Sequence, residues 1–312
     1  QATARAEARA EARSGALVSA AAQEWAERST LQLRELAARA SWKRTSSWTG
    51  PTDGTGRRLF APPFRHGRIR RGSRGVVTCS APSLLNETAL MLARLVRVGN
   101  VLPVEVWHVD ELSQAEARRL QGMHAIARGV VVRDLTAALS HTLDAAEVAA
   151  MRGFMCKPLA VLASSLDEVL LVDHDARFFL DPAALFESTT FVRTGMLLFR
   201  DRLRLHIRHQ PVVDAPRFVR QLLRRRLGSP RFLAAEGFRP LPWPWRPSPS
   251  LLESPIVTGD SHHAIDSSVL LLSKSHAPQL TAALYILHEK YRHELYANLH
   301  GDKETYWLAC EL

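Results

Sequence analysis

The chain has 312 residues, of which 46% are apolar and 23% charged, a composition typical of a globular protein with a sizeable core. Its formal net charge of +10 suggests an anionic partner, but only 5 of its 41 basic residues are lysine and most arginines are scattered. The sequence has neither zinc-finger spacing nor an aromatic RNA-binding segment, which argues against nucleic-acid binding. It also has no run of about 18 apolar residues, the length that a membrane-spanning helix needs.

The composition of the first 73 residues predicts a change from helix to irregular structure. Residues 1–40 are rich in Ala, Arg and Glu with few large apolar side chains, which predicts a helical stem. Residues 41–73 are dominated by Ser, Thr, Gly, Pro and Arg, which predicts an irregular linker. We therefore expect the folded domain to occupy residues 74–312. The alternative is that the first helix packs on the core.

Strand and helix patterns alternate from residue 75 onward. The expected order is a strand at 75–79, a helix at 84–98, a strand at 102–109, a helix at 111–125, a strand at 129–132, a helix at 157–165 and a strand at 169–172. Further strands are expected at 194–199 and 266–272, with a helix at 280–291. Such alternation predicts an α/β fold with parallel strands.

The most informative motif follows the apolar strand at 169–172, where the chain reads Asp173-His174-Asp175. Ligands of open α/β sheets bind beyond the carboxyl ends of such strands. Two carboxylates there can hold a divalent metal through one member and a ribose or metal-bound water through the other. The alternative is a solvated turn.

Two later segments carry further candidate residues. His300-Gly301-Asp302-Lys303 combines a carboxylate with a cation, which suits a sugar hydroxyl and a diphosphate; a capped helix start is the alternative. The Trp-rich stretch at 242–247 is a candidate acceptor lip or a packing loop. Cys79, Cys156 and Cys310 are too few and too far apart in sequence to predict a disulfide framework or a cysteine metal site.

Several segments together resemble a known family, the fungal-type Golgi α-mannosyltransferases of glycosyltransferase family 71. They are GVVTCSAP at 75–82, LPVEVWHVDELS at 102–113, the run from 157 to 188 that includes LLVDHDARFFLDP, TGMLLFRDR at 194–202 and GDKETYWLA at 301–309. The resemblance implies a GT-A-like, Rossmann-type mixed sheet flanked by helices. It also implies GDP-mannose as donor, Mn²⁺ or another divalent cation, and retaining α-mannosyl transfer to a mannose-containing glycan of a glycoprotein.

The resemblance also assigns roles by position. Asp173, Asp175 and His300 are predicted to hold the metal, and Thr78, Lys157, Asp173 and Lys303 to bind the donor. Asp266 and Asp302 are the candidate catalytic carboxylates, with Asp266 preferred. The alternatives are that Asp266 merely opens a strand and that His300 is a surface residue.

Family membership further implies a Golgi-lumen protein of type II topology. Because the chain begins with Gln1, we expect a membrane anchor upstream of it, and because family members continue beyond the last matched segment, we expect a C-terminal truncation. Two other functions are compatible with the same residues. One is a GT-A transferase that uses a UDP-sugar, and the other is a non-catalytic glycan-binding relative.

Overall fold

The computed structural model describes residues 69–123, 129–138, 144–201, 217–219, 248–258, 260–261 and 263–311. The predicted stem at 1–40, the linker up to residue 68 and the Trp-rich stretch at 242–247 lie outside these ranges. The chain divides into two compact units, the larger holding all six described strands and the smaller holding α10 (Pro249–Leu252) and α11 (Pro255–Thr258). No helix among the described residues is long and apolar enough to cross a membrane.

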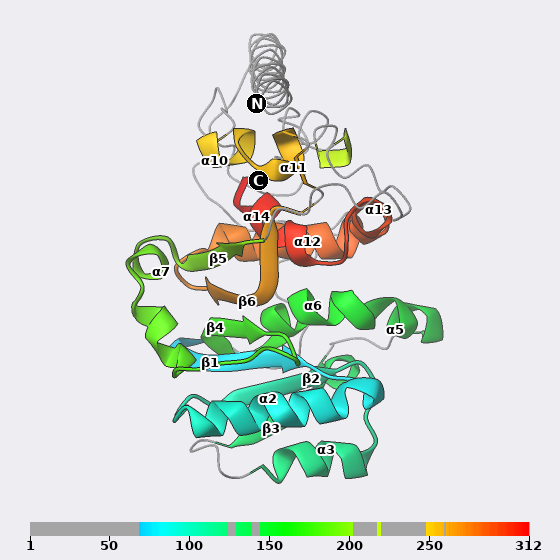
Figure 1. The fold of residues 1–312 in the computed structure, drawn as a ribbon. Coiled ribbons are helices and arrows are strands. Elements are labelled where there is room, and N and C mark those ends of the chain that lie inside the picture. The colour runs from blue at the N-terminus through cyan, green and yellow to red at the C-terminus, as the bar shows by residue number, and fades with distance from the viewer. Residues whose placement is uncertain are drawn as a thin grey trace, which may run out of the picture. The chain divides into compact units, whose positions relative to one another are not determined.

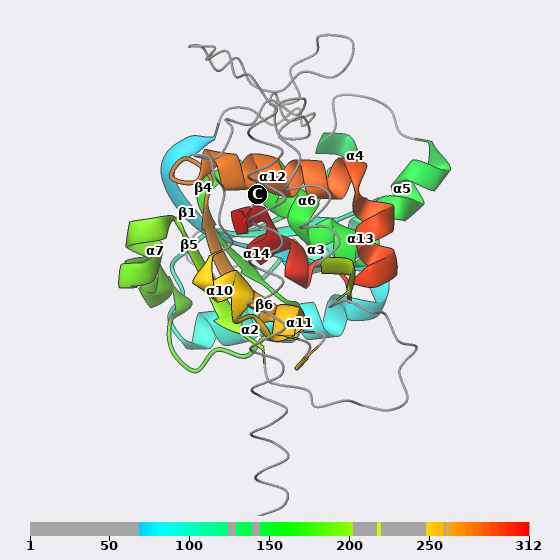
Figure 2. The ribbon, with the colours of Figure 1, turned by 90° about the horizontal axis from the view of Figure 1, so that it is seen from above.

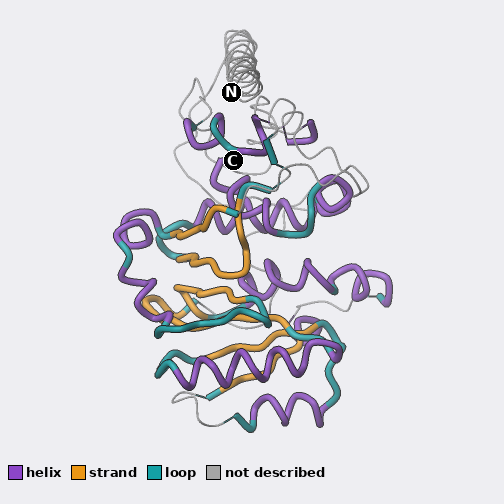
Figure 3. Tube along the Cα trace, viewed as in Figure 1, coloured by secondary structure: helices purple, strands orange, loops and turns teal. Residues whose placement is uncertain are grey.

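The larger unit is built on a six-stranded mixed sheet with the order β3-β2-β1-β4-β6-β5 (Figures 1 and 3). The strands are β1 (Arg70–Cys79), β2 (Val104–His108), β3 (Val130–Asp134), β4 (Leu166–Val172), β5 (Met196–Arg200) and β6 (Ile265–Ser273). The strands β1 to β4 are parallel to one another, whereas β6 runs antiparallel to both β4 and β5. The predicted α/β class and mixed sheet are confirmed. The first strand begins at Arg70, before the predicted domain start at 74.

Helices cover both faces of this sheet. They are α2 (Leu85–Arg97), α3 (Gln114–Gln121), α4 (Leu135–Ala138), α5 (Ala145–Met151), α6 (Cys156–Ala163), α7 (Thr189–Thr194), α12 (Pro278–Lys290), α13 (Arg292–Asn298) and α14 (Lys303–Glu311), with 3-10 turns at Pro82–Leu84, Gly153–Met155 and Pro182–Glu187. Seen from above, α2 lies on one side of the sheet and α6 and α12 on the other (Figure 2). The central strands are therefore buried on both faces.

The core explains why these segments adopt these structures. The run Val169-Leu170-Leu171-Val172 is fully buried, as expected of a parallel strand that is covered on both faces. Leu85, Met91, Leu92 and Leu95 lie on one face of α2 and join the same cluster as Leu170 and Val172. Burying this apolar surface fixes the position of β4, and with it the loop that starts at Asp173.

Three helices are joined by a buried histidine. His288 of α12 contacts the Thr305 hydroxyl through Nε2 at 2.9 Å and the Tyr296 hydroxyl through Nδ1 at 3.1 Å. Because Thr305 donates its own hydrogen to the backbone oxygen of Asp302, His288 donates from Nε2 and accepts at Nδ1. This tautomer is neutral, and burial lowers the pKa of His288 to about 3.

Because His288 is buried in its neutral form, we expect the folded chain to lose stability in mild acid. Its pKa in the folded chain is below the value of about 6.5 in an unfolded chain, so the neutral form's contribution is complete above pH 6.5 and falls as the pH drops toward 3. The loss should approach about 1.4 kcal/mol per pH unit below pH 6. Urea unfolding at pH 8, 6 and 5 should show a shallower pH dependence for His288→Gln than for the wild type. An equal pH dependence of the free energy of unfolding in the two proteins would contradict the assignment of His288 as a buried neutral residue.

Candidate functional site

The sheet has one position where the chain's connections diverge. From β1 the order continues to β2 and β3 on one side and to β4 on the other, so the switch point lies between β1 and β4. The carboxyl ends of these two strands are at Cys79 and Val172, and the next residue after β4 is Asp173. Ligands of open α/β sheets bind at this kind of edge. The acidic loop is therefore placed where an α/β protein binds its ligand.

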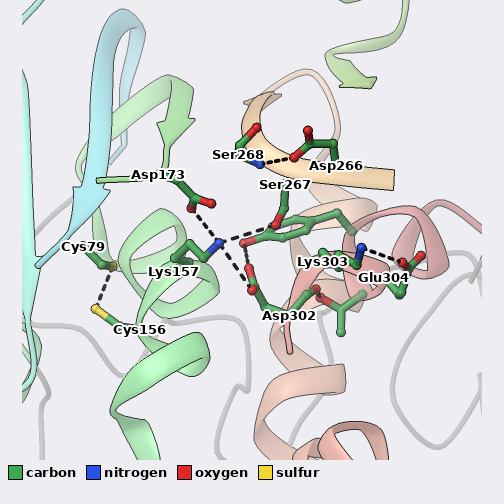
Figure 4. A network of polar contacts seen from close by, with 12 residues as sticks. Cys79, Cys156, Lys157, Asp173, Asp266, Ser267, Ser268, Asp302, Lys303 and Glu304 are labelled. Atoms are coloured by element: carbon green, nitrogen blue, oxygen red, sulfur yellow. Dashed lines mark hydrogen bonds and ion pairs between the residues drawn. The ribbon is translucent and has the colours of Figure 1, made fainter. Parts of the chain in front are cut away.

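Lys157 holds the first aspartate of this loop. It lies in the first turn of α6, and its Nζ is 2.7 Å from an Asp173 carboxylate oxygen and 3.4 Å from the Ser267 hydroxyl (Figure 4). The backbone N–H of Asp173 donates to the Ser268 carbonyl at 2.8 Å. Both the backbone and the side chain of Asp173 are thus positioned. Lys157, a predicted donor-binding residue, contacts this carboxylate directly.

A second carboxylate, Asp302, lies behind Lys157. Its Oδ1 is 3.6 Å from the Lys157 Nζ, and its Oδ2 accepts a hydrogen bond from the Tyr306 hydroxyl at 3.0 Å. Asp302 is only 1% exposed, and burial raises its pKa while Lys157 opposes this effect. Burial alone would lower the pKa of Lys157, but Asp302 and Asp173 outweigh it and raise the pKa. Lys157 is therefore a firmly charged cation between two carboxylates.

The structure brings Ser267, and not the preferred Asp266, to this cluster. Asp266 and Ser267 are neighbours on β6, and successive side chains of a strand point to opposite faces, so only one of the two can face Lys157. Asp266 accepts the backbone N–H of Ser268 at 2.8 Å, and Figure 4 shows the two residues together on the other side of the strand from Lys157. Of the two candidate catalytic carboxylates, Asp302 is the one that contacts Lys157. Ser267 is a contact that the sequence pattern did not indicate.

Lys303 and His300 have other neighbours. The Lys303 Nζ is 2.6 Å from an Asp201 carboxylate oxygen, so this predicted donor-binding cation is paired with the residue that follows β5. The His300 ring lies 5.7 Å from the Phe154 ring, centroid to centroid. Gly301, the residue after His300, has φ +74°, and a Cβ there would approach the Phe154 ring to 2.8 Å. Glycine is required at this turn.

Asp175 and Thr78 complete the set of predicted residues. Asp175 is exposed, whereas Thr78 on β1 is fully buried and its hydroxyl has no hydrogen-bond partner among the described residues. Within the described ranges, no group of three or more His, Cys, Asp or Glu side chains is arranged to hold a metal ion. Asp173, Asp175 and His300 therefore do not form a three-residue metal cage in this structure. The donor-binding role of Thr78 stays a prediction.

A family model described as a mannosyltransferase matches residues 73–312, which include the whole Lys157, Asp173 and Asp302 cluster. The chain belongs to this mannosyltransferase family. The resemblance predicted from the sequence is confirmed at the level of the family.

Individual relatives are distant and longer than this chain. "Probable alpha-1,3-mannosyltransferase MNT4" of Saccharomyces cerevisiae is 23% identical over 84% of this chain and 45% of its own length. Alpha-1,3-mannosyltransferase MNT2 of the same yeast is 26% identical over 46% of this chain and 26% of its own length. The chain thus spans less than half of these curated relatives. Among solved structures, core-mannan synthase A from Aspergillus fumigatus, in a form described as Mn/GDP, matches with a TM-score of 0.46 at 10% identity, covering 88% of this chain and 77% of that one.

The cluster generates a prediction about stability that does not depend on catalysis. Replacing Lys157 by Met leaves Asp173 and the buried Asp302 without their cation, which should lower the free energy of unfolding by about 3–5 kcal/mol. Adding Asp302→Asn to Lys157→Met should recover part of the loss, because the buried negative charge is removed. Denaturant unfolding monitored by tryptophan fluorescence measures both. A loss below about 1 kcal/mol for Lys157→Met, the range of exposed ion pairs, would show that the pairing is weak.

Proposed function

We propose that this chain transfers an α-mannosyl group from GDP-mannose to a mannose-containing glycan, with the help of a divalent cation such as Mn²⁺. The observation that carries the proposal is the position of Asp173 and Asp175 at the carboxyl end of β4, inside the region that matches the mannosyltransferase family. From the same family relationship we infer a GT-A-like fold, a glycoprotein acceptor and a membrane-anchored setting in the Golgi lumen.

The arrangement of the carboxylates fits a cation shared with the donor. Small divalent cations at nucleotide sites are commonly bound by one or two carboxylates, with phosphate oxygens and waters completing the shell. Asp173 and Asp175 supply two such carboxylates, and carboxylate ligands suit manganese. Asp175 is exposed and available, whereas Asp173 is oriented by Lys157. A bound cation would offset the negative charge that develops on the departing diphosphate.

Lys157 affects both the net charge of the acidic loop and the orientation of Asp173. With Asp173 and Asp302 it forms a group with one positive and two negative charges, so the acidic loop keeps a net negative charge that attracts a cation. Lys157 also prevents Asp173 from rotating away from the ligand edge. We therefore assign Lys157 and Asp302 as positioning residues for Asp173. Asp302, at 1% exposure, is assigned to act on Asp173 through Lys157 and not through contact with the sugar.

The decisive variant is Asp175→Asn, which removes a metal ligand without removing a residue from the core. Release of GDP from GDP-mannose, with a mannose oligosaccharide as acceptor, should require added Mn²⁺ in the wild type. In Asp175→Asn the rate should fall by at least about 100-fold, which corresponds to the loss of a few kcal/mol of transition-state stabilisation. Glu87→Gln, at an exposed carboxylate on α2, is the matched control and should leave the rate unchanged.

A panel of donors distinguishes the alternatives in the same assay. Release of UDP from a UDP-sugar, without release of GDP from GDP-mannose, would replace the proposed donor. Glycan binding without release of either nucleotide would make the chain a non-catalytic relative. Full activity in Asp175→Asn would contradict the metal assignment.

A further inference from the structure

Two cysteines lie in contact at the ligand edge of the sheet. Cys79 is the last residue of β1 and Cys156 is the first residue of α6, 77 positions later in the chain. Their Sγ atoms are 2.7 Å apart, well inside the distance at which unbonded sulfur atoms rest against each other (Figure 4). Sequence spacing did not indicate this pair, because the fold alone brings the two residues together.

The surrounding structure holds the two sulfur atoms in place. The helix α6 packs against β1, β2 and β4, so Cys79 and Cys156 are carried by two layers that are packed on each other. A disulfide has an S–S bond of about 2.05 Å, which these atoms can reach by a shift of less than about 1 Å. Within the described residues no third His, Cys, Asp or Glu joins the pair to make a metal site.

We propose that Cys79 and Cys156 form a disulfide bond when the chain folds in an oxidising environment. The oxidant is a small-molecule disulfide such as oxidised glutathione. One cysteine thiolate attacks it to give a mixed disulfide and one glutathione thiol, and the second cysteine then displaces the other glutathione. Two protein thiols are oxidised and one glutathione disulfide is reduced to two thiols, so electrons and protons balance.

The bond forms before the two sulfur atoms are enclosed. Cys156 is 3% exposed, and burial raises the pKa of the Cys79 thiol well above its ordinary value, so thiolate is scarce in the folded chain. Once made, the bond is shielded from exchange for the same reason.

The bond would brace the residue that orients the acidic loop. Cys156 directly precedes Lys157, so a Cys79–Cys156 bond ties the carboxyl end of β1 to the first turn of α6, which carries the Lys157 ammonium group. The inference requires neither the metal nor the donor, so it can fail or succeed independently of the proposed function.

The first experiment counts free thiols in the intact chain. Protein produced in an oxidising compartment is unfolded in guanidinium chloride without reductant, alkylated with N-ethylmaleimide and weighed by mass spectrometry. We expect one adduct, at the exposed Cys310, and three adducts after prior reduction. A peptide pair joined through Cys79 and Cys156 should appear in a non-reducing digest. Three adducts without reduction would overturn the proposal.

The second experiment measures what the bond does for stability. A disulfide across a loop of this length raises the thermal midpoint by on the order of 10 °C. Reductant present while the chain is unfolded and refolded, when the sulfur atoms are accessible, should therefore lower the Tm of the wild type and of the control Cys310→Ser by this amount. It should leave the Tm of the double variant Cys79→Ala with Cys156→Ala unchanged, because that variant has no bond to lose. Equal Tm values for the wild type with and without reductant would contradict the proposal.

Discussion

The ion pairs of Lys157 are the interaction on which the site depends. A single ammonium group joins the loop after β4 to the turn before α14, and each of these segments brings a carboxylate that would repel the other without it. In a largely buried setting such charges are costly unless they are paired, so the cation and the two carboxylates form as a unit. The orientation of Asp173 therefore depends on residues that are distant in the sequence, and a change at any of them reaches the ligand edge.

Further hydrogen bonds hold Asp302 itself in position. Its carboxylate accepts from Tyr306, and its backbone oxygen accepts from Thr305, which is in turn held by the neutral His288. These contacts connect α12 and α13 to the start of α14. Gly301 permits the turn that aims Asp302 at Lys157, because its backbone has a positive φ and Phe154 leaves no space for a side chain. This polar framework holds the site in place together with the apolar core.

Local patterns predicted the acidic loop but not the cluster around it. The apolar run at 169–172 and the two aspartates that follow are adjacent in sequence, so their strand and strand-end positions could be inferred directly. The meeting of Lys157 with Asp302 depends on the fold bringing the first turn of α6 to the residue before α14, which no local pattern encodes. Which of the neighbours Asp266 and Ser267 faces the cluster depends on how β6 is oriented in the sheet, and the Cys79–Cys156 contact results from the packing of α6 on β1. In each case tertiary packing decided the outcome.

The proposed function requires that Asp173 and Asp175 bind a divalent cation together with a guanosine diphosphate. Thermal unfolding of the chain with GDP or UDP, each with and without Mn²⁺, tests this claim most directly, because a ligand of the native state raises the Tm by mass action. We expect a clear rise in Tm with GDP and Mn²⁺ together, and little or no rise with GDP alone or with UDP and Mn²⁺. An equal rise with GDP in the absence of Mn²⁺ would contradict it.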